Sequence, residues 1–142
     1  MLRVKYLLTL KPKEVWSIEP ESAVLQAIQI MAERHIGALP VMRGAELLGI
    51  VSERDYARKV ILKGRSSADT PVRDIMSTPV TTVSPDEAVH RCMEIMTELR
   101  IRHLPVVEKG RVVGMVSIGD LVKAVIEEQQ QTISQLERYI AS

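Results

Sequence analysis

The feature that most constrains this chain is an internal duplication. Residues 15–61 align with residues 80–126 without a gap, at a constant offset of 65. A unit of this length buries its apolar face poorly when it is alone. We therefore expect two copies of one unit packed about a pseudo-twofold axis, with two equivalent clefts beside that axis. The positions that are identical in both copies include Pro20/Pro85, Ala23/Ala88, Val24/Val89, Ile30/Ile95, Met31/Met96, Ile36/Ile101, Leu39/Leu104, Pro40/Pro105, Val41/Val106, Gly49/Gly114, Val51/Val116, Ser52/Ser117 and Asp55/Asp120.

Each copy predicts the same order of elements. A short extended segment (15–18 or 80–83) leads to Pro20 or Pro85. Proline suits the start of a helix because its missing N–H is not needed there. Two apolar runs around a Gly-containing turn then predict a hairpin, and a second helix opens at Ser52 or Ser117. The fold class is therefore α+β, with two β-α-β-β-α repeats. Apolar residues at helical spacing predict the buried faces of the first helices, namely Val24, Leu25, Ile28, Met31 and Ala32 in one copy and Val89, Cys92, Met93, Met96 and Leu99 in the other.

The repeats divide the chain into four segments. Residues 1–63 hold the first repeat with its lead-in, 64–79 a polar linker and a helical lead-in at 72–76, 80–127 the second repeat, and 128–142 a helical extension. In the extension Ile133, Leu136 and Ile140 have heptad a, d, a spacing. Two interpretations stay open: the extension packs on its own domain, or it contacts a second copy of the chain.

Composition excludes several classes of protein. The 142 residues carry a formal net charge of +1, 46% are hydrophobic and one is cysteine. One cysteine cannot form an intramolecular disulfide, and no apolar stretch is long enough for a signal peptide core or a membrane span. We expect a cytoplasmic protein that does not enter membranes. Nucleic acid binding is disfavoured because it would need Arg54, Arg58, Lys59, Lys63 and Arg65 to form one basic surface.

Catalytic motifs are missing from the sequence. It contains no phosphate loop, no Gly-x-Gly-x-x-Gly, no His-Glu-x-x-His and no Cys-x-x-Cys. Cys92 lies on an apolar helix stripe, where cysteine is usually a small core residue. His35, His90 and His103 are too scattered to predict a metal site. We expect a protein that is not an enzyme and binds no metal.

The repeated chemical motif is Gly-h-Val-Ser-x-x-Asp, which occurs at residues 49–55 and 114–120. One interpretation is structural: Ser is a good N-cap, and an acid three residues later completes a capping box. The other is functional, because a helix N-terminus can receive phosphate and an aspartate can accept both hydroxyls of a ribose. The spacing alone leaves both open.

With this motif, the segments Ile-Gly-Ala-Leu-Pro-Val (36–41) and Ile-Arg-His-Leu-Pro-Val (101–106) make the chain similar to a pair of cystathionine β-synthase (CBS) domains. The resemblance covers about residues 4–127 and is closest to small stand-alone bacterial proteins made of this pair, the Bateman module. It implies a regulatory sensor of AMP, ATP, NAD(H) or S-adenosylmethionine, a homodimer of modules, and an effector protein that receives the signal. A scaffolding module with empty clefts is the alternative.

The resemblance also implies two composite binding sites. In each, the Ser-x-x-Asp segment of one repeat works with the first strand of the other and with the residues before its Leu-Pro-Val. The aspartates hold ribose, the serines meet ribose or phosphate, and residues 36–38 and 101–103 meet adenine. One site comprises Ile50, Ser52, Arg54, Asp55, Thr81, Thr82, Ile101, Arg102 and His103; the other comprises Met115, Ser117, Gly119, Asp120, Trp16, Ser17, Ile36, Gly37 and Ala38.

The two composite sites differ in charge. Arg54, Arg102 and His103 of the Asp55 site correspond to Gly119, Gly37 and Ala38 of the Asp120 site. Because Arg binds phosphate oxygens strongly, we expect the Asp55 site to take the ligand with more phosphates. Trp16 is the one tryptophan, and it either anchors the core or stacks on adenine.

Overall fold

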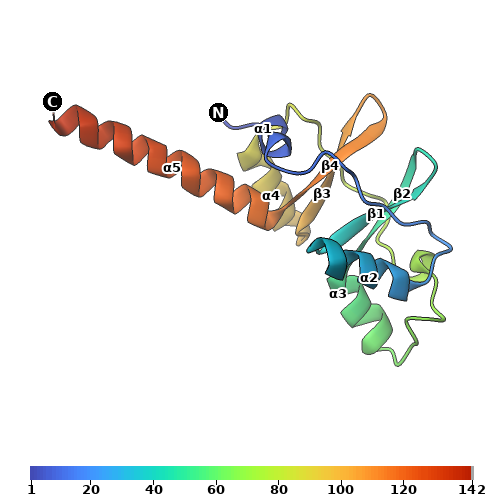
Figure 1. The fold of residues 1–142 in the computed structure, drawn as a ribbon. Helices are drawn as coiled ribbons and strands as arrows, with labels where there is room; N and C mark the ends of the chain where they lie inside the picture. The colour runs from blue at the N-terminus through green and yellow to red at the C-terminus, as the bar shows by residue number, and fades with distance from the viewer. Residues whose placement is uncertain (142) are drawn as a thin grey trace. The chain divides into compact units, whose positions relative to one another are not determined.

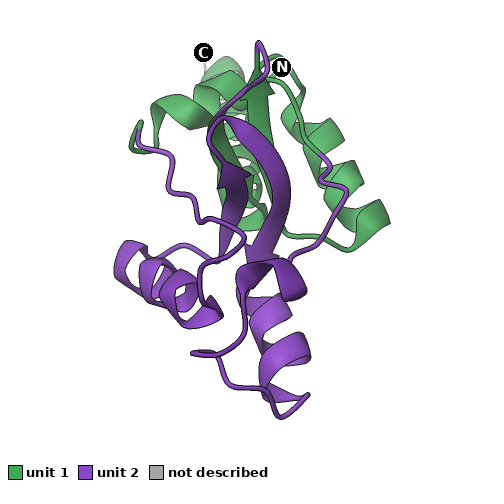
Figure 2. Cartoon of the chain, turned by 90° about the vertical axis from the view of Figure 1, so that its right-hand side faces the viewer, with its two compact units in different colours: residues 1–13, 82–108, 113–142 green, residues 14–81, 109–112 purple. Residues whose placement is uncertain are grey.

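The computed structural model describes residues 1–141, which form two compact units. Unit 1 comprises residues 1–13, 82–108 and 113–142, and unit 2 comprises residues 14–81 and 109–112 (Figure 2). The mixed α+β class is confirmed, whereas packing of the repeats about a pseudo-twofold axis stays a prediction. No helix among the described residues is long and apolar enough to cross a membrane.

Unit 2 carries the first repeat. It contains α2 (Val24–Arg34), the antiparallel hairpin of β1 (Ala38–Arg43) and β2 (Glu46–Ser52), and α3 (Glu53–Tyr56), which continues as a π-helix, η1 (Ala57–Ile61) (Figure 1). The linker then leads to a 3-10 turn, η2 (Val72–Asp74). The core of unit 2 comprises Ile18, Val24, Ala27, Met31, Leu39, Val41, Val51, Val60, Val72 and Ile75.

Unit 1 carries the second repeat and the N-terminal segment. Its elements are α1 (Val4–Thr9), α4 (Val89–Leu99), the hairpin of β3 (His103–Glu108) and β4 (Arg111–Ser117) apart from its turn and first two residues, 109–112, and α5 (Ile118–Ala141). The predicted second helix and the C-terminal extension are thus one continuous helix. The core of unit 1 comprises Val4, Leu7, Val83, Val89, Cys92, Met96, Leu104, Val106, Val116, Leu121 and Ala124.

The two lead-in segments complete their units in the same way. Val4 and Leu7 of α1 lie in the core with the second repeat, and Val72 and Ile75 lie in the core with the first. The segment before each repeat in the sequence therefore packs with the other repeat. Chain order groups residues 1–13 with the first repeat, whereas burial groups them with the second.

The helices α2 and α4 begin later than the prolines suggest. Pro20 and Pro85 lie four residues before them, and the N-caps are Ala23 and Ala88, which make no side-chain cap. Backbone carbonyls from elsewhere cap these helices instead: the Val24 N–H donates to the Thr70 carbonyl (2.9 Å) and the Val89 N–H to the Leu2 carbonyl (3.0 Å). Tertiary contacts thus determine where the helices start.

Three further expectations are corrected by the structure. The first strands at 15–18 and 80–83 are reduced to single parallel bridges, Ile18 to Val41 and Val83 to Val106. The helical lead-in predicted at 72–76 is present but shorter, a 3-10 helix over Val72–Asp74. On the first helices Leu25, Ala32 and Leu99 are exposed, and the buried residues are Val24, Ala27 and Met31 in α2 and Val89, Cys92 and Met96 in α4.

Candidate functional site

The first Ser-x-x-Asp motif opens α3 in unit 2 and forms a complete capping box. The Asp55 carboxylate accepts hydrogen bonds from the Ser52 N–H and hydroxyl (both 3.0 Å), and the Asp55 N–H donates to the Ser52 hydroxyl oxygen (3.2 Å). The reciprocal bonds satisfy two donors that a helix start otherwise leaves open. The motif therefore has its structural role as a capping box. These bonds fix the orientation of the Asp55 carboxylate at the N-terminus of α3.

The other oxygen of Asp55 meets two groups that the predicted composite site does not include. Lys59 Nζ lies 3.2 Å from Asp55 Oδ1, and the Ser77 hydroxyl lies 3.4 Å from the same oxygen. Lys59 also donates to the Ile75 carbonyl at 2.9 Å. The Asp55 side chain is only 12% exposed. A ligand that binds this carboxylate must share it with these donors or replace the two longer contacts on Oδ1.

The second motif repeats the arrangement at the start of α5 in unit 1. Asp120 Oδ2 accepts from the Ser117 N–H at 2.9 Å, and the Asp120 N–H donates to the Ser117 hydroxyl at 3.2 Å. Lys11 Nζ lies 2.8 Å from the same Oδ2 and donates to the Met115 carbonyl at 2.6 Å. The Asp120 side chain is 28% exposed, more than twice the value for Asp55.

The charge state of Asp120 reflects these contacts. Burial by itself raises the pKa of the carboxyl, but hydrogen bonds from Lys11 and Ser117 and the charge of the Lys11 ammonium outweigh it and hold the pKa below its usual value. Asp120 is thus fixed as an anion. Each candidate carboxylate has one lysine beside it, although the two lysines come from unrelated positions in the sequence.

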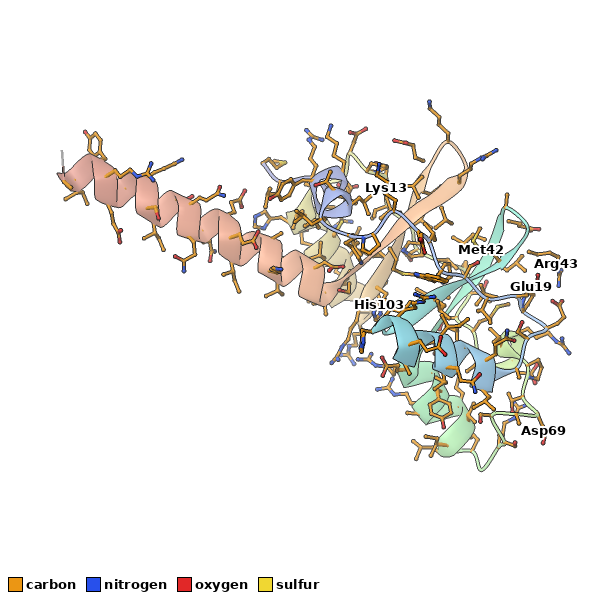
Figure 3. All side chains as sticks on the ribbon, viewed as in Figure 1. Lys13, Glu19, Met42, Arg43, Asp69 and His103 are labelled. Carbon is orange, nitrogen blue, oxygen red and sulfur yellow. The ribbon has the colours of Figure 1, made fainter. Side chains whose placement is uncertain are left out.

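The residues before Leu-Pro-Val lie next to the helix start of their own repeat. In unit 2 the Glu53 N–H donates to the Gly37 carbonyl at 3.1 Å, and Ala38 pairs with Ser52 across the hairpin. In unit 1 the Ile118 N–H donates to the Arg102 carbonyl at 2.9 Å, and His103 begins β3 (Figure 3). The carbonyls of Gly37 and Arg102 therefore accept hydrogen bonds from backbone N–H groups at the helix N-termini. These are among the groups that would otherwise be open to a phosphate.

Both predicted composite sites draw residues from both units. The structure brings Ile36, Gly37, Ala38, Ile50, Ser52, Arg54 and Asp55 together in unit 2, and Ile101, Arg102, His103, Met115, Ser117, Gly119 and Asp120 together in unit 1. Thr81 and Trp16 are half-buried, and Ser17 and Thr82 are exposed. The combination of these halves into shared clefts stays a prediction.

Trp16 packs against the core of unit 2 and has a charged neighbour. The Arg34 guanidinium carbon lies 3.8 Å from the centroid of the Trp16 ring, in cation–π geometry. One face of the ring is therefore occupied within unit 2. This arrangement agrees with the anchor interpretation of Trp16 and leaves less ring surface for stacking on a base.

Lys11, Lys59 and Ser77 were not predicted as neighbours of the two aspartates, although Lys59 was named as one of five basic residues. Lys59 could have been found, because it is one helical turn after Asp55 and an i, i+4 pair is readable from sequence. Lys11 gives no such signal, since it is separated from Asp120 by 109 positions. Ser77 reaches Asp55 through a backbone bridge between Ile50 and Ser77, which also has no sequence signature.

Comparison with known proteins identifies the family. The CBS domain model matches residues 11–62 and 72–127. The mitochondrial CBS domain-containing protein CBSX3 of Arabidopsis thaliana is 44% identical over 125 residues, which cover 84% of this chain and 61% of that protein. The CBS domain-containing protein YhcV of Bacillus subtilis (strain 168) is 32% identical over 76% of each chain.

The fold has close structural relatives as well. A solved protein with CBS domains from Burkholderia ambifaria MC40-6 is 46% identical and superposes with a TM-score of 0.86 over 90% of this chain and 96% of its own. This chain spans about three fifths of the plant protein and nearly all of the Burkholderia chain. On these matches, and on the duplicated motifs described above, the chain belongs to the CBS domain family and carries a tandem pair of CBS domains.

Proposed function

We propose that this CBS pair is a regulatory module that senses adenine nucleotides of the AMP, ATP, NAD(H) or S-adenosylmethionine type. The observation that carries the proposal is the recurrence, in both units, of an ionisable Asp beside a helix N-terminus that is fixed by its own Ser. A carboxylate held in this way is pre-organised to accept the two hydroxyls of a ribose. The duplication supplies the same arrangement twice.

Within this proposal the residues divide by role. Asp55 and Asp120 hold ribose, while Ser52 and Ser117 meet ribose or phosphate. The backbone at residues 36–38 and 101–103 meets the adenine edge. Arg54, Arg102 and His103 favour a ligand with more phosphates at the Asp55 site, and Lys59 adds to that charge. Lys11 gives the Asp120 site a cation as well, so the two lysines offset each other and the contrast in charge between the sites comes from Arg54, Arg102 and His103.

The proposed module does no chemistry. Among the described residues no three His, Cys, Asp or Glu side chains gather as a metal site requires. Burial and the charge of Glu87 raise the pKa of the Cys92 thiol to about 11, so it is a poor nucleophile at neutral pH. Ligand occupancy would be read by an effector protein or through self-association as a homodimer, in the cytoplasm.

The competing proposal is a scaffolding module whose clefts stay empty. It is favoured by the contacts that both carboxylates already make, because each completes a capping bond and an ion pair within its unit. In this case the Ser-x-x-Asp motifs only stabilise helix starts, and self-association is the function of the protein.

A thermal scan separates the two proposals. The protein is melted with AMP, ATP, NAD and S-adenosylmethionine, each at millimolar concentration. A ligand at 100 times its dissociation constant adds about 2.7 kcal/mol, which raises the melting temperature by several degrees. An unchanged melting temperature with all four ligands would contradict nucleotide sensing and favour the scaffold.

The variants Asp55→Asn and Asp120→Asn assign the ligand to its site. For ribose binding, each variant loses the ligand-induced shift of its own site because an amide accepts fewer hydrogen bonds than a carboxylate. The capping role by itself lowers the melting temperature without ligand, by an amount that corresponds to about 1 kcal/mol. Asp69→Asn, which changes an exposed acid outside both motifs, is the matched control.

A further inference from the structure

The last helix of unit 1 carries an apolar stripe that nothing in its own unit covers. α5 is 24 residues long, and in Figure 1 its C-terminal part extends beyond α1 and α4, the other helices of unit 1. The stripe comprises Val122, Ile126, Ile133, Leu136 and Ile140, whose exposed fractions range from 40% to 82%. An exposed apolar row on an ordered helix marks an interaction surface.

The stripe has coiled-coil spacing. With Ile126 at heptad position a, Ile133 and Ile140 are also a residues, and Val122, Gln129 and Leu136 occupy d. Leu121 and Ala124, which are buried in the core of unit 1, lie on another side of the helix. Their burial fixes the first turns of α5, so the costly nucleation of the helix is already complete before a partner arrives.

The flanking charges favour a second copy of the chain in antiparallel orientation. When a residues of one helix face d residues of the other, Val122 lies opposite Ile140 and Ile126 opposite Leu136. The e residues Lys123 and Glu137 then meet twice, once on each side of the twofold axis. In a parallel pair Lys123 would instead lie near Ile118 of the second copy, and no opposite charges would meet.

We propose that α5 pairs with α5 of a second copy as an antiparallel two-stranded coiled coil along residues 122–140, about 27 Å of helix. The pair buries five apolar side chains from each copy and joins Lys123 of each to Glu137 of the other. The partner is identified by self-complementarity, because one surface supplies both the stripe and the matching charges. This inference names a surface for self-association and does not depend on nucleotide binding.

The first test removes one apolar residue from the stripe. Ile133→Glu places a charge in the centre of the proposed interface, and sedimentation equilibrium should show the association weakened by about a hundredfold or more. The matched control Gln131→Glu adds the same charge at position f, on the opposite side, and should leave association unchanged. An unchanged mass for Ile133→Glu at all concentrations, or a wild-type chain that stays monomeric, would overturn the proposal.

Charge reversal provides a second test that does not disturb the apolar stripe. Lys123→Glu should weaken association several-fold because two ion pairs become repulsive. The double variant Lys123→Glu with Glu137→Lys should restore it. Failure of the double variant to restore association contradicts the pairing of these two residues. A normal nucleotide shift in Ile133→Glu would show that sensing and self-association are separate, so that either can fail alone.

Pulsed electron resonance then fixes the orientation. Spin labels at Gln131→Cys lie level with each other in the antiparallel pair, whereas labels at Arg138→Cys are offset along the axis by fourteen residues, about 21 Å. The second pair should therefore give the longer distance. Equal distances would indicate a parallel pair and overturn the proposed arrangement. The native Cys92 is 0% exposed and serves as the unlabelled background.

Discussion

The lysine beside Asp120 is the residue that most alters the candidate site in unit 1. Lys11 holds the carboxylate as an anion, and the same ammonium bonds the Met115 carbonyl. A ribose that approaches Asp120 must therefore displace Lys11 or leave it as a cation beside the phosphate. The second possibility makes Lys11 part of the site, and the first makes it a competitor.

The stabilising effect of Lys11 can be measured through pH. Because the folded pKa of Asp120 lies below its unfolded value of about 3.9, the stabilisation is present above pH 4 and lost as pH falls through the folded pKa. Lys11→Met should lower the free energy of unfolding at pH 7 by about 1 kcal/mol. Urea unfolding from pH 7 to pH 3 should show the difference from wild type shrinking on the acid side.

The control for this measurement is Lys13→Met. Lys13 is an exposed lysine two residues further on, labelled in Figure 3, and its replacement should leave stability nearly unchanged. A deficit for Lys11→Met that stays constant down to pH 3 would mean that the contact with the Met115 carbonyl, and not the ion pair with Asp120, carries the stabilisation.

For individual residues, the sequence predicted the pairing of Ser and Asp within each motif but not the lysines that contact the aspartates. The spacing Ser-x-x-Asp predicts the bond between Ser52 and Asp55, because a capping box depends only on residues within one turn. Contacts such as Lys11 to Asp120 depend on how distant segments pack. Local spacing cannot indicate them.

Among the elements, the hairpins show how a shared motif acquires different surroundings in the two units. Gly49 and Gly114 occupy matching positions in β2 and β4. A Cβ at Gly49 would lie 2.7 Å from Met76 Sδ and 3.1 Å from the Ser77 carbonyl, whereas a Cβ at Gly114 would meet mainly the end of the Leu8 side chain, at 2.6 Å. A side-chain end can rotate away more easily than backbone can move.

We therefore predict that Gly49→Ala and Gly114→Ala differ in their effect. Gly49→Ala should lower the free energy of unfolding by about 1–3 kcal/mol, and Gly114→Ala by less than about 1 kcal/mol. Chemical denaturation of the two variants under identical conditions provides the comparison. Equal losses would contradict the view that the backbone carbonyl of Ser77 makes the site in unit 2 the tighter one.

Element boundaries were predictable where a turn dictates them. The hairpins follow from β-branched runs around Gly44 and Gly110, which adopt positive φ angles of 60° and 75°. The starts of α2 and α4 were not predictable, because carbonyls of Thr70 and Leu2 cap them from distant parts of the chain. The segments at 15–18 and 80–83 each make a single bridge and not a full strand pairing. A segment with one bridge has no alternating apolar pattern that would distinguish it from a loop.

For the whole molecule, the chain contains one natural reporter in each unit. Trp16 lies against the core of unit 2, and Cys92 lies in the core of unit 1 with its thiol pKa raised to about 11. Tryptophan fluorescence therefore follows unit 2, and the rate of thiol labelling follows unit 1. The two signals can be recorded on the same sample without any substitution.

These reporters test whether the proposed binding sites are shared between units. A saturating nucleotide held by residues from both units must raise the denaturation midpoints of both signals. A ligand that raises one midpoint and leaves the other in place would indicate a site built within a single unit. Asp55→Asn and Asp120→Asn with the same ligand identify which carboxylate carries each shift.

The duplication itself was predictable, since thirteen named identities at one offset leave little freedom in the alignment. The exchange of the lead-in segments was not. Val4 and Leu7 are apolar in any arrangement, and their helical spacing does not say which repeat they cover. Only the packing in the two cores distinguishes them.

That exchange has a consequence for how the chain can be divided. A cut after Gly64 yields fragments 1–64 and 65–142, and each compact unit then contains segments from both fragments. Neither fragment holds a complete core, so each would fold poorly by itself and regain structure on mixing. The linker that looks like a boundary between two modules is thus the point at which this protein would behave as a split-protein complementation pair.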